Sequence, residues 1–270
     1  MAEGLANLPV TPAVASVQVS APWMTTVRYD MKADTNPALQ DRYAGAGALI
    51  GPQHVLTAGH LFDLNMPAAP EEPGDDRIPP PAPLAERAHF VRVGADGIDT
   101  GDRYEIVEVH TEFSVMQAMG AGQPEQMKDI AVLVLDRPVV DIEPIPLATE
   151  PVAVNDRVSV LGWPNGPWGH GELVQVNTCI VSADAAVFNY PCKDELSFAN
   201  VSGDDHIQRG FSGAPVFRFT SHDGRVELVG VTSRGNPLDL GEGLESPGTF
   251  ADAAGAHREF IEKCLAGVSA

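Results

Sequence analysis

The sequence predicts an all-β protein built in two halves, and three features support this prediction. Glycine and proline are frequent, with 26 and 23 of the 270 residues, which favours many short elements joined by turns. Short apolar runs rich in β-branched residues recur along the chain, as in a β-sandwich or barrel. Only one segment shows the apolar spacing of a helix.

The first half contains six apolar runs that we expect to be strands. Each is alternating or continuously apolar and is bounded by turn residues. Residues 63–87 interrupt them, and because their many prolines fix φ and lack an N–H group, we expect a long surface loop there. The six expected strands lie in residues 23–31, 45–51, 54–60, 88–95, 104–110 and 129–136.

The second half repeats the pattern and ends in a helix. The polar, turn-rich segment 148–157 is the expected boundary between the halves. Residues 250–265 are rich in alanine, and their apolar side chains recur with helical spacing, which predicts a helix from Phe250 to Leu265. The expected strands of this half lie in residues 156–164, 172–183, 213–219 and 226–235.

The composition excludes several classes of partner. The formal net charge is −20, which argues against nucleic acid and anionic membrane surfaces, because their phosphates would be repelled. Solubility is the simplest explanation of this charge, and a preference for basic substrates is the alternative. No run of 18 apolar residues predicts a transmembrane helix. The N-terminus lacks the pattern of a signal peptide, so we expect a cytoplasmic protein, or a secreted or periplasmic one whose signal was removed.

The cysteines and acidic residues predict no metal site and no cofactor. The chain has three cysteines, Cys179, Cys192 and Cys264. Their odd number and wide spacing exclude a dense disulfide framework and a C-x-x-C zinc site. Cys179 and Cys192 could pair across a hairpin, although reduced buried thiols fit equally well. The acidic stretch from Glu71 to Asp76 is too irregular to predict a calcium site.

Three polar residues together predict nucleophilic catalysis. Ser212 lies in the glycine-rich stretch "RGFSGAPVF", His60 ends "VLTAGH", and Asp129 opens the apolar run "DIAVLVLD". A serine hydroxyl needs a neutral imidazole to take its proton, and the imidazole needs a carboxylate to orient it. A carboxylate at the start of an apolar strand is expected to be partly buried and therefore paired. Taken alone, each residue also has a purely structural interpretation. Ser212 fits a tight turn, His60 a turn or capping residue, and Asp129 a solvated residue at the start of a strand.

These motifs identify a family. The chain resembles the chymotrypsin-like (trypsin-fold) serine peptidases: "LTAGH" is similar to their [ST]-A-A-H motif, "DIAVLVL" to D-I-A-L-L and "GFSGAP" to G-D-S-G-G-P. Further matches are "PW" at residues 22–23, "VTSRG", and "SPGTF" followed by a helix. The matches occur in the family's order from about residue 22 to residue 262.

The resemblance implies an architecture. The expected fold is all-β, with two six-stranded antiparallel β-barrels, a C-terminal α-helix, and the active site in the cleft between the barrels. The implied divisions are an N-terminal extension over residues 1–21, a first barrel over 22–147 that carries His60 and Asp129, a second barrel over 148–249 that carries Ser212, and a helix and tail over 250–270.

The resemblance also implies a role for each site residue. Ser212 would attack the peptide carbonyl, His60 would act as base and then as acid, and Asp129 would orient His60. Ser233 would support Asp129, and the N–H groups of Gly210 and Ser212 would form the oxyanion hole. The implied protein is a serine endopeptidase that acts on protein or peptide substrates and needs no cofactor.

The chain departs from the family pattern beside the serine. Phe211 replaces an aspartate that receives the new N-terminal ammonium in activated zymogens, and no Arg or Lys followed by an I-V-G-G-like start lies near residues 8–14. This implies a constitutively formed member, as among similar bacterial proteins, or control by another partner, or a collapsed and inactive oxyanion loop. Leu61 and Gln208 replace cysteines of the family, which suits an intracellular or bacterial protein.

The sequence is compatible with more than one substrate specificity. Gly235 and Gly248 match positions that line an open pocket, and His206 takes the floor position, with Asp204 and Asp205 beside it. His206 with Arg234 would suit an acidic P1 residue, Asp205 would suit a basic one, and all of these side chains could instead face solvent. A catalytically silent pseudoprotease or regulatory binding module of the same fold, and an esterase, are the alternative functions.

Overall fold

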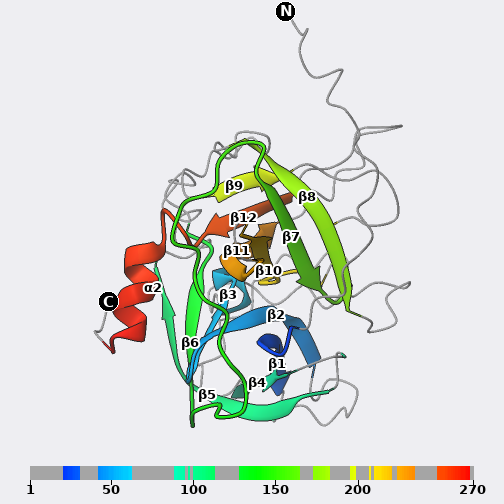
Figure 1. Ribbon diagram of the computed structural model, residues 1–270. Helices are drawn as coiled ribbons and strands as arrows, with labels where there is room; N and C mark the ends of the chain where they lie inside the picture. The colour runs from blue at the N-terminus through cyan, green and yellow to red at the C-terminus, as the bar shows by residue number, and fades with distance from the viewer. Residues whose placement is uncertain are drawn as a thin grey trace, which may run out of the picture.

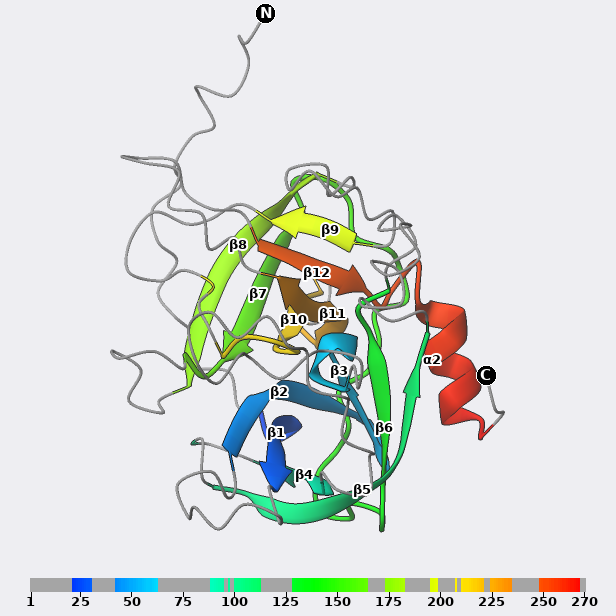
Figure 2. The same ribbon diagram turned by 180° about the vertical axis from the view of Figure 1, so that it is seen from behind.

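Two closed six-stranded barrels and one C-terminal helix make up the described structure (Figures 1 and 2). The computed structural model describes residues 21–30, 42–62, 88–94, 97, 100–112, 128–164, 173–182, 195–198, 207, 210–220, 224–234 and 248–267. The architecture predicted from the sequence, two antiparallel barrels with a C-terminal helix, is confirmed.

The first barrel has the strand order β1-β2-β3-β6-β5-β4, and all its neighbouring strands are antiparallel. In the pairing of β3 with β6, Leu56 lies opposite Val132 and Thr57 opposite Ala131. The end of β3 and the start of β6 therefore lie side by side, which brings the segments beyond them together. The strands are β1 (Met24–Asp30), β2 (Arg42–Gly51), β3 (His54–Thr57), β4 (Ala88–Val93), β5 (Asp102–Thr111) and β6 (Ala131–Leu135).

The second barrel has the order β10-β11-β12-β9-β8-β7. Val216, Phe217, Val231 and Phe250 are fully buried in it, and each such side chain stabilises the fold by roughly 1.5–3 kcal/mol. β10 contacts β2 and β11 contacts β3, so this barrel is packed directly against the first. The strands are β7 (Arg157–Gly162), β8 (Val174–Ser182), β9 (Glu195–Phe198), β10 (Pro215–Phe219), β11 (Val226–Arg234) and β12 (Gly248–Asp252).

The predicted helix begins later than the sequence suggested. Residues 250–252 are the end of β12, and helix α2 spans Arg258–Leu265. The prediction of a helix from Phe250 is wrong because Phe250 is buried in the barrel and pairs with Leu196 of β9. The Asp252 carboxylate accepts the N–H of Gly255 at 2.9 Å and so holds a turn between strand and helix. β12 therefore extends across residue 249, where the second barrel was expected to end.

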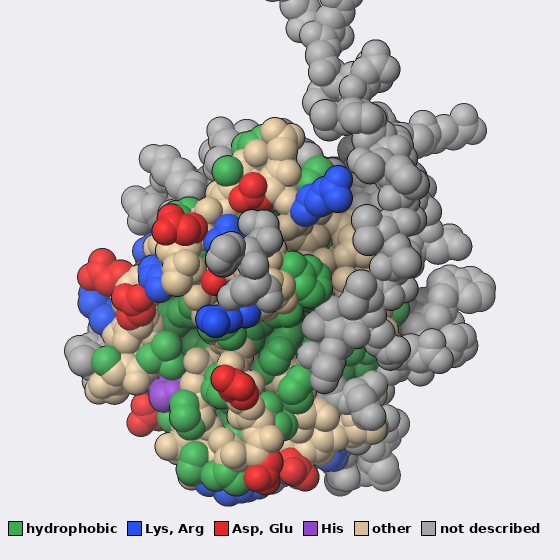
Figure 3. Space-filling model, viewed as in Figure 1, with side chains coloured by type: hydrophobic (Ala, Val, Ile, Leu, Met, Phe, Trp, Pro, Cys, Tyr) green, Lys and Arg blue, Asp and Glu red, His purple; other side chains and the backbone are tan. Residues whose placement is uncertain are grey.

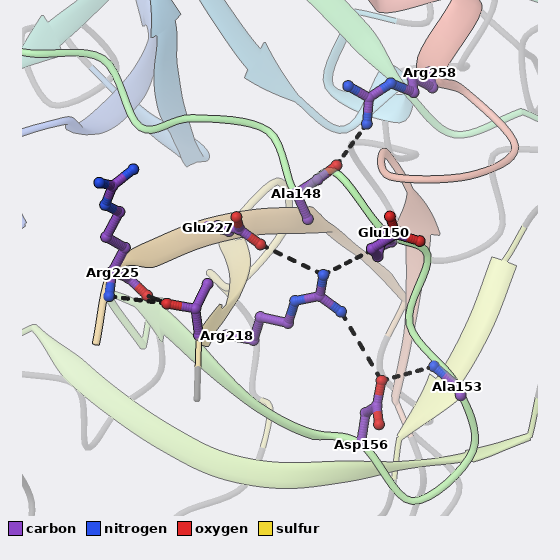
Figure 4. A network of polar contacts seen from close by, with 9 residues as sticks. Ala148, Glu150, Ala153, Asp156, Arg218, Arg225, Glu227 and Arg258 are labelled. Carbon is purple, nitrogen blue, oxygen red and sulfur yellow. Dashed lines mark hydrogen bonds and ion pairs between the residues drawn. The ribbon is translucent and has the colours of Figure 1, made fainter. Parts of the chain in front are cut away.

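The segment between the barrels is held by backbone and arginine contacts. Ile145 donates its N–H to Leu49 of β2 at 2.9 Å, whereas Ala148 donates to Leu228 of β11 at 2.8 Å. The chain thus passes from one barrel to the other between these two residues. Arg218 of β10 then donates to the Glu150 carbonyl at 2.9 Å and also contacts Glu227 and Asp156 (Figure 4).

Helix α2 lies beside β5 and β6 of the first barrel (Figures 1 and 2). Its buried side chains are Phe260, Ile261 and Cys264. At its start, Arg258 donates to the Ala148 carbonyl at 2.5 Å, so the helix also contacts the segment between the barrels (Figure 4). Among the helices that the structure describes, none combines the length and the apolar character needed to cross a bilayer.

The described surface carries charged side chains of both signs. On the face seen in Figure 3, acidic and basic side chains are interspersed across the described surface.

Cys179 and Cys264 are free thiols. Cys192 and the predicted loop over residues 63–87 lie outside the described residues.

Candidate active site

His60 lies on a tight turn that follows β3. The turn, η2 (Gly59–Phe62), packs on the backbone just before β6, since a Cβ atom at Gly59 would lie 3.0 Å from both the nitrogen and the oxygen of Ile130. This close approach leaves little room for a side chain at residue 59. The imidazole of His60 is 22% exposed, so it faces both the protein interior and solvent.

Asp129 is buried beneath His60. Its side chain is 1% exposed, and its Oδ1 accepts the backbone N–H of His60 at 2.7 Å. Its Oδ2 lies 2.8 Å from Nδ1 of His60 and also accepts the hydroxyl of Ser233 from β11. The structure thus brings His60 and Asp129 of the first barrel together with Ser233 of the second.

The electrostatics of Asp129 determine the state of the imidazole. Burial alone would raise the pKa of this carboxyl, but attraction by His60 and hydrogen bonds from His60 and Ser233 outweigh burial and hold the pKa below its ordinary value. The ionised carboxylate only accepts hydrogen bonds, so Nδ1 of His60 carries the proton. In the neutral ring, Nε2 is then the unprotonated nitrogen.

Ser212 lies on a loop that is hydrogen-bonded to both barrels. Its carbonyl accepts the N–H of Ala46 from β2 at 2.8 Å, and the N–H of Gly213 donates to Thr232 of β11 at 2.8 Å. Gly210 and Gly213 have φ values of +100° and +74°, which side-chain-bearing residues rarely adopt. Glycine is needed at both positions for this path of the backbone.

The serine loop lies against the residues that precede His60. A Cβ atom at Gly213 would meet the hydroxyl of Thr57, the carbonyl of Ala46 and, at 3.0 Å, the nitrogen of Ala58. Ser212 is partly exposed, and in the described part of the chain its hydroxyl makes no hydrogen bond to His60. Such contacts often form only when substrate tightens the site.

Replacement of Gly213 by alanine tests this packing. The new methyl group would collide with backbone atoms of the first barrel and strain a positive φ, so we expect a loss of roughly 2–4 kcal/mol in the free energy of unfolding. Denaturant unfolding of both proteins measures the change. Gly224→Ala is the matched control, because Gly224 has a φ of +70° but open space around it. Equal losses in the two variants would contradict the packing argument.

Phe211 anchors the serine loop from its other side. The side chain is almost completely buried, and a Cβ atom at Gly162 of β7 would lie 2.7 Å from its ring. The Phe211 carbonyl accepts the N–H of Ala214 at 2.8 Å, which closes the turn around Ser212. An apolar contact therefore holds the serine loop at residue 211.

The predicted pocket residues are only partly described. Gly248 begins β12, opposite Phe198 of β9, and Arg234 ends β11, opposite Thr249. His206, Gly235 and the side chain of Arg234 lie outside the described residues. The P1 preference therefore stays a prediction.

Sequence reasoning missed one buried acid next to Ser233. Glu195 of β9 is 1% exposed, and its Oε1 lies 2.9 Å from the Ser233 hydroxyl. Its stretch "DELSF" contains acidic and polar residues, so nothing in the pattern marked a buried strand.

A second missed cluster lies next to Asp129 in the sequence. Glu112 accepts from Lys128 at 2.8 Å and lies 2.8 Å from Nδ1 of His257, which is fully buried at the start of α2. Burial would raise the pKa of Glu112, but His257 and Lys128 outweigh it and lower that pKa. Among the described residues, no group of three or more His, Cys, Asp or Glu side chains could hold a metal ion.

The chain matches a known protein family. A protein-family model described as Trypsin matches residues 13–256. No curated protein matches the chain.

Proposed function

Because the chain belongs to the trypsin family of serine peptidases, we propose that it is a serine endopeptidase in which Ser212, His60 and Asp129 form the catalytic triad. One observation carries this proposal: a buried aspartate binds both the backbone N–H and Nδ1 of a partly exposed histidine. An aspartate in this position keeps the proton on Nδ1, so Nε2 of the neutral ring is the general base that we propose.

The reaction starts at Ser212. Its Oγ attacks the peptide carbonyl carbon while Nε2 of His60 takes the hydroxyl proton. The resulting imidazolium is stabilised by Asp129. The tetrahedral intermediate expels the amine, which receives the proton from Nε2, and an acyl-enzyme remains. Water, activated by His60, then attacks the ester and releases the carboxylic acid product and the free Ser212.

The backbone of the serine loop stabilises the oxyanion. The N–H groups of Gly210 and Ser212 are its proposed donors, and each such donor contributes roughly 3–4 kcal/mol to transition-state stabilisation. In support, the N–H of Ser212 makes no hydrogen bond within the described part of the chain, so it is able to donate to substrate. Gly210 has the positive φ that this turn requires.

Two experiments separate this function from its rivals. A fluorophosphonate probe labels an activated serine, so labelling distinguishes an enzyme from a silent binding module of the same fold. Cleavage of a peptide library distinguishes a peptidase from an esterase, and it also reports the P1 preference. Labelling without any peptide cleavage would favour the esterase.

The loop anchored by Phe211 predicts activity without N-terminal processing. Phenylalanine cannot pair with an ammonium group, and its burial against Gly162 holds the loop without one. We therefore expect the chain of residues 1–270 and versions with additional N-terminal residues to hydrolyse peptides at rates that agree within about threefold. Activity that appears only after cleavage near residues 8–14 would rule out this constitutive form.

A further inference from the structure

The ring of Phe211 lies directly on the backbone of Gly162, the last residue of β7. Both residues are buried. A Cβ atom at Gly162 would lie 2.7, 3.0 and 3.1 Å from three consecutive ring carbons, Cδ1, Cε1 and Cγ. Carbon atoms in contact are normally roughly 3.5–4.0 Å apart. The ring therefore occupies the space that a side chain at residue 162 would need.

The backbone of Gly162 does not itself call for a glycine. This residue is not among the described glycines that have a positive φ, so an alanine could adopt the same backbone conformation without the strain expected at Gly213. What the glycine provides at residue 162 is room for the ring.

The other anchors of the serine loop are backbone hydrogen bonds. The Ser212 carbonyl accepts from Ala46 of β2, and the N–H of Gly213 donates to Thr232 of β11, each at 2.8 Å. These two contacts lie at Ser212 and after it. The contact of Phe211 with Gly162 lies immediately before it, so the nucleophile is held between fixed points on both sides.

We propose that Phe211 and Gly162 are positioning residues of the serine loop, and that the ring, packed on the backbone of β7, fixes the direction of the Ser212 N–H toward the oxyanion. This proposal rests on the proposed function. The planar peptide unit that joins Phe211 to Ser212 carries this N–H. A displacement of the ring moves the peptide unit and turns the N–H away from the oxyanion.

The sizes of the two residues are coupled, because the contact depends on shape and not on charge. A methyl group at residue 162 needs a shorter side chain at residue 211. A shorter side chain at residue 211, in turn, leaves a gap over Gly162. The coupling predicts that one change can compensate for the other.

Gly162→Ala in the full chain is the first test. The methyl group needs roughly 1 Å of additional separation from the ring, and a misplacement of that size can lower a rate on the order of 10²-fold. We expect kcat for peptide hydrolysis to fall roughly 30-fold to 100-fold, with KM changed by less than about twofold. The rate of fluorophosphonate labelling should fall by a similar factor, because the phosphonyl oxygen of the probe takes the position of the oxyanion.

Phe211→Leu supplies the compensating change. Leucine lacks the outer carbons of the ring, and we expect this variant alone to have a kcat roughly tenfold below the wild type. In the double variant Gly162→Ala/Phe211→Leu the methyl group fills the gap, so kcat should be roughly tenfold above that of Gly162→Ala. A contact that only stabilised the fold would not produce this rescue in folded protein.

Gly51→Ala is the matched control for a methyl group on a buried strand. Gly51 ends β2, is not among the described glycines with a positive φ, and a Cβ atom there would lie 2.9 Å from Cδ2 of Leu265. We expect this variant to lose stability in denaturant unfolding while its kcat stays within about twofold of the wild type. Each kcat is divided by the folded fraction measured for the same variant.

Nuclear magnetic resonance gives a reading that needs no activity. The amide signals of Ser212 and Gly213 should shift in Gly162→Ala and return toward their wild-type positions in the double variant. The amide signal of Gly224, which has open space around it, should stay unchanged in both.

The outcomes are distinct. A wild-type kcat in Gly162→Ala, or a loss in the double variant equal to the product of the two single losses, would overturn the proposal. If Gly162→Ala does not fold, Phe211→Leu still decides, because a wild-type kcat in that variant also overturns it. If the unmodified chain neither labels nor cleaves peptides, the proposed function fails, while the amide signals still show whether the ring positions the loop.

Discussion

Replacement of Ser212 by alanine is expected to abolish labelling by fluorophosphonates and to lower kcat for peptide hydrolysis on the order of 10⁶-fold. The variant loses the atom that attacks the carbonyl, and water bound in its place lacks the orientation of a fixed hydroxyl. A stopped peptide assay at high enzyme concentration, together with gel detection of the probe, measures both losses.

The fold of this variant should be unchanged. Ser212 is bound to the first barrel through its carbonyl, which accepts from Ala46, and alanine keeps that carbonyl. The control is Ser159→Ala, which removes a mostly buried hydroxyl that contacts Asn177 at 2.7 Å on β8. We expect the control to keep its activity. Wild-type turnover in Ser212→Ala would show that the nucleophile is another residue.

Replacement of Asp129 by asparagine is expected to lower kcat on the order of 10⁴-fold near neutral pH. The amide preserves the shape of the side chain, but it can donate where the carboxylate only accepts. It therefore favours the imidazole tautomer with the proton on Nε2, and that nitrogen can no longer act as a base. Activity should recover in part at high pH, where hydroxide helps to remove the proton of Ser212. A pH profile of kcat for both proteins measures this.

Asp136 provides the matched control for this change. It lies just beyond the other end of β6, 31% exposed, where it accepts the N–H of Glu105 at 3.0 Å and pairs with Arg137 at 2.7 Å. Asp136→Asn should alter kcat by less than about threefold, because surface ion pairs contribute little. If Asp136→Asn lost activity and Asp129→Asn kept it, the carboxylate of the proposed triad would be Asp136, at the other end of the strand.

The lowered pKa of Asp129 also has a consequence for stability. Because the folded state lowers this pKa, the ionised carboxylate stabilises the folded state above the ordinary pKa of aspartate. That contribution is lost as the pH falls through the lowered folded-state value. Asp129 therefore affects stability and catalysis in different pH ranges. Its contribution to stability is lost only at low pH, whereas catalysis already requires a pH at which His60 is neutral.

The sequence predicted ten of the twelve strands because their side chains are apolar and β-branched. β9 was missed because its four residues include Glu195 and Ser197, which are polar yet buried. β12 was missed because the alanines that follow it extend a helical pattern back across Phe250. The hydrophobic pattern of a short segment does not show whether a neighbouring strand is available to bury its polar residues.

The same reasoning explains which parts of the site were predictable. His60, Asp129 and Ser212 stand in motifs whose residue types and order point to one chemistry, and the structure places His60 and Asp129 in contact. Glu195 contacts Ser233 across 38 residues, and His257 contacts Glu112 across 145 residues. Neither pair has a local signal, because each arises only when separate strands and the helix are packed together.

The attachment of α2 bears on the order in which the enzyme matures during synthesis. Its first turn binds Glu112 of the first barrel through His257 and the carbonyl of Ala148 through Arg258. The ribosome makes these two residues after both barrels, so a nascent chain that has completed the strands still lacks this contact. Since Glu112 also holds Lys128, the neighbour of Asp129, the surroundings of the Asp129 carboxylate are complete only when α2 has packed against the first barrel. In a chain that folds as it is synthesised, this buried carboxylate would therefore acquire its full set of neighbours after both barrels have formed.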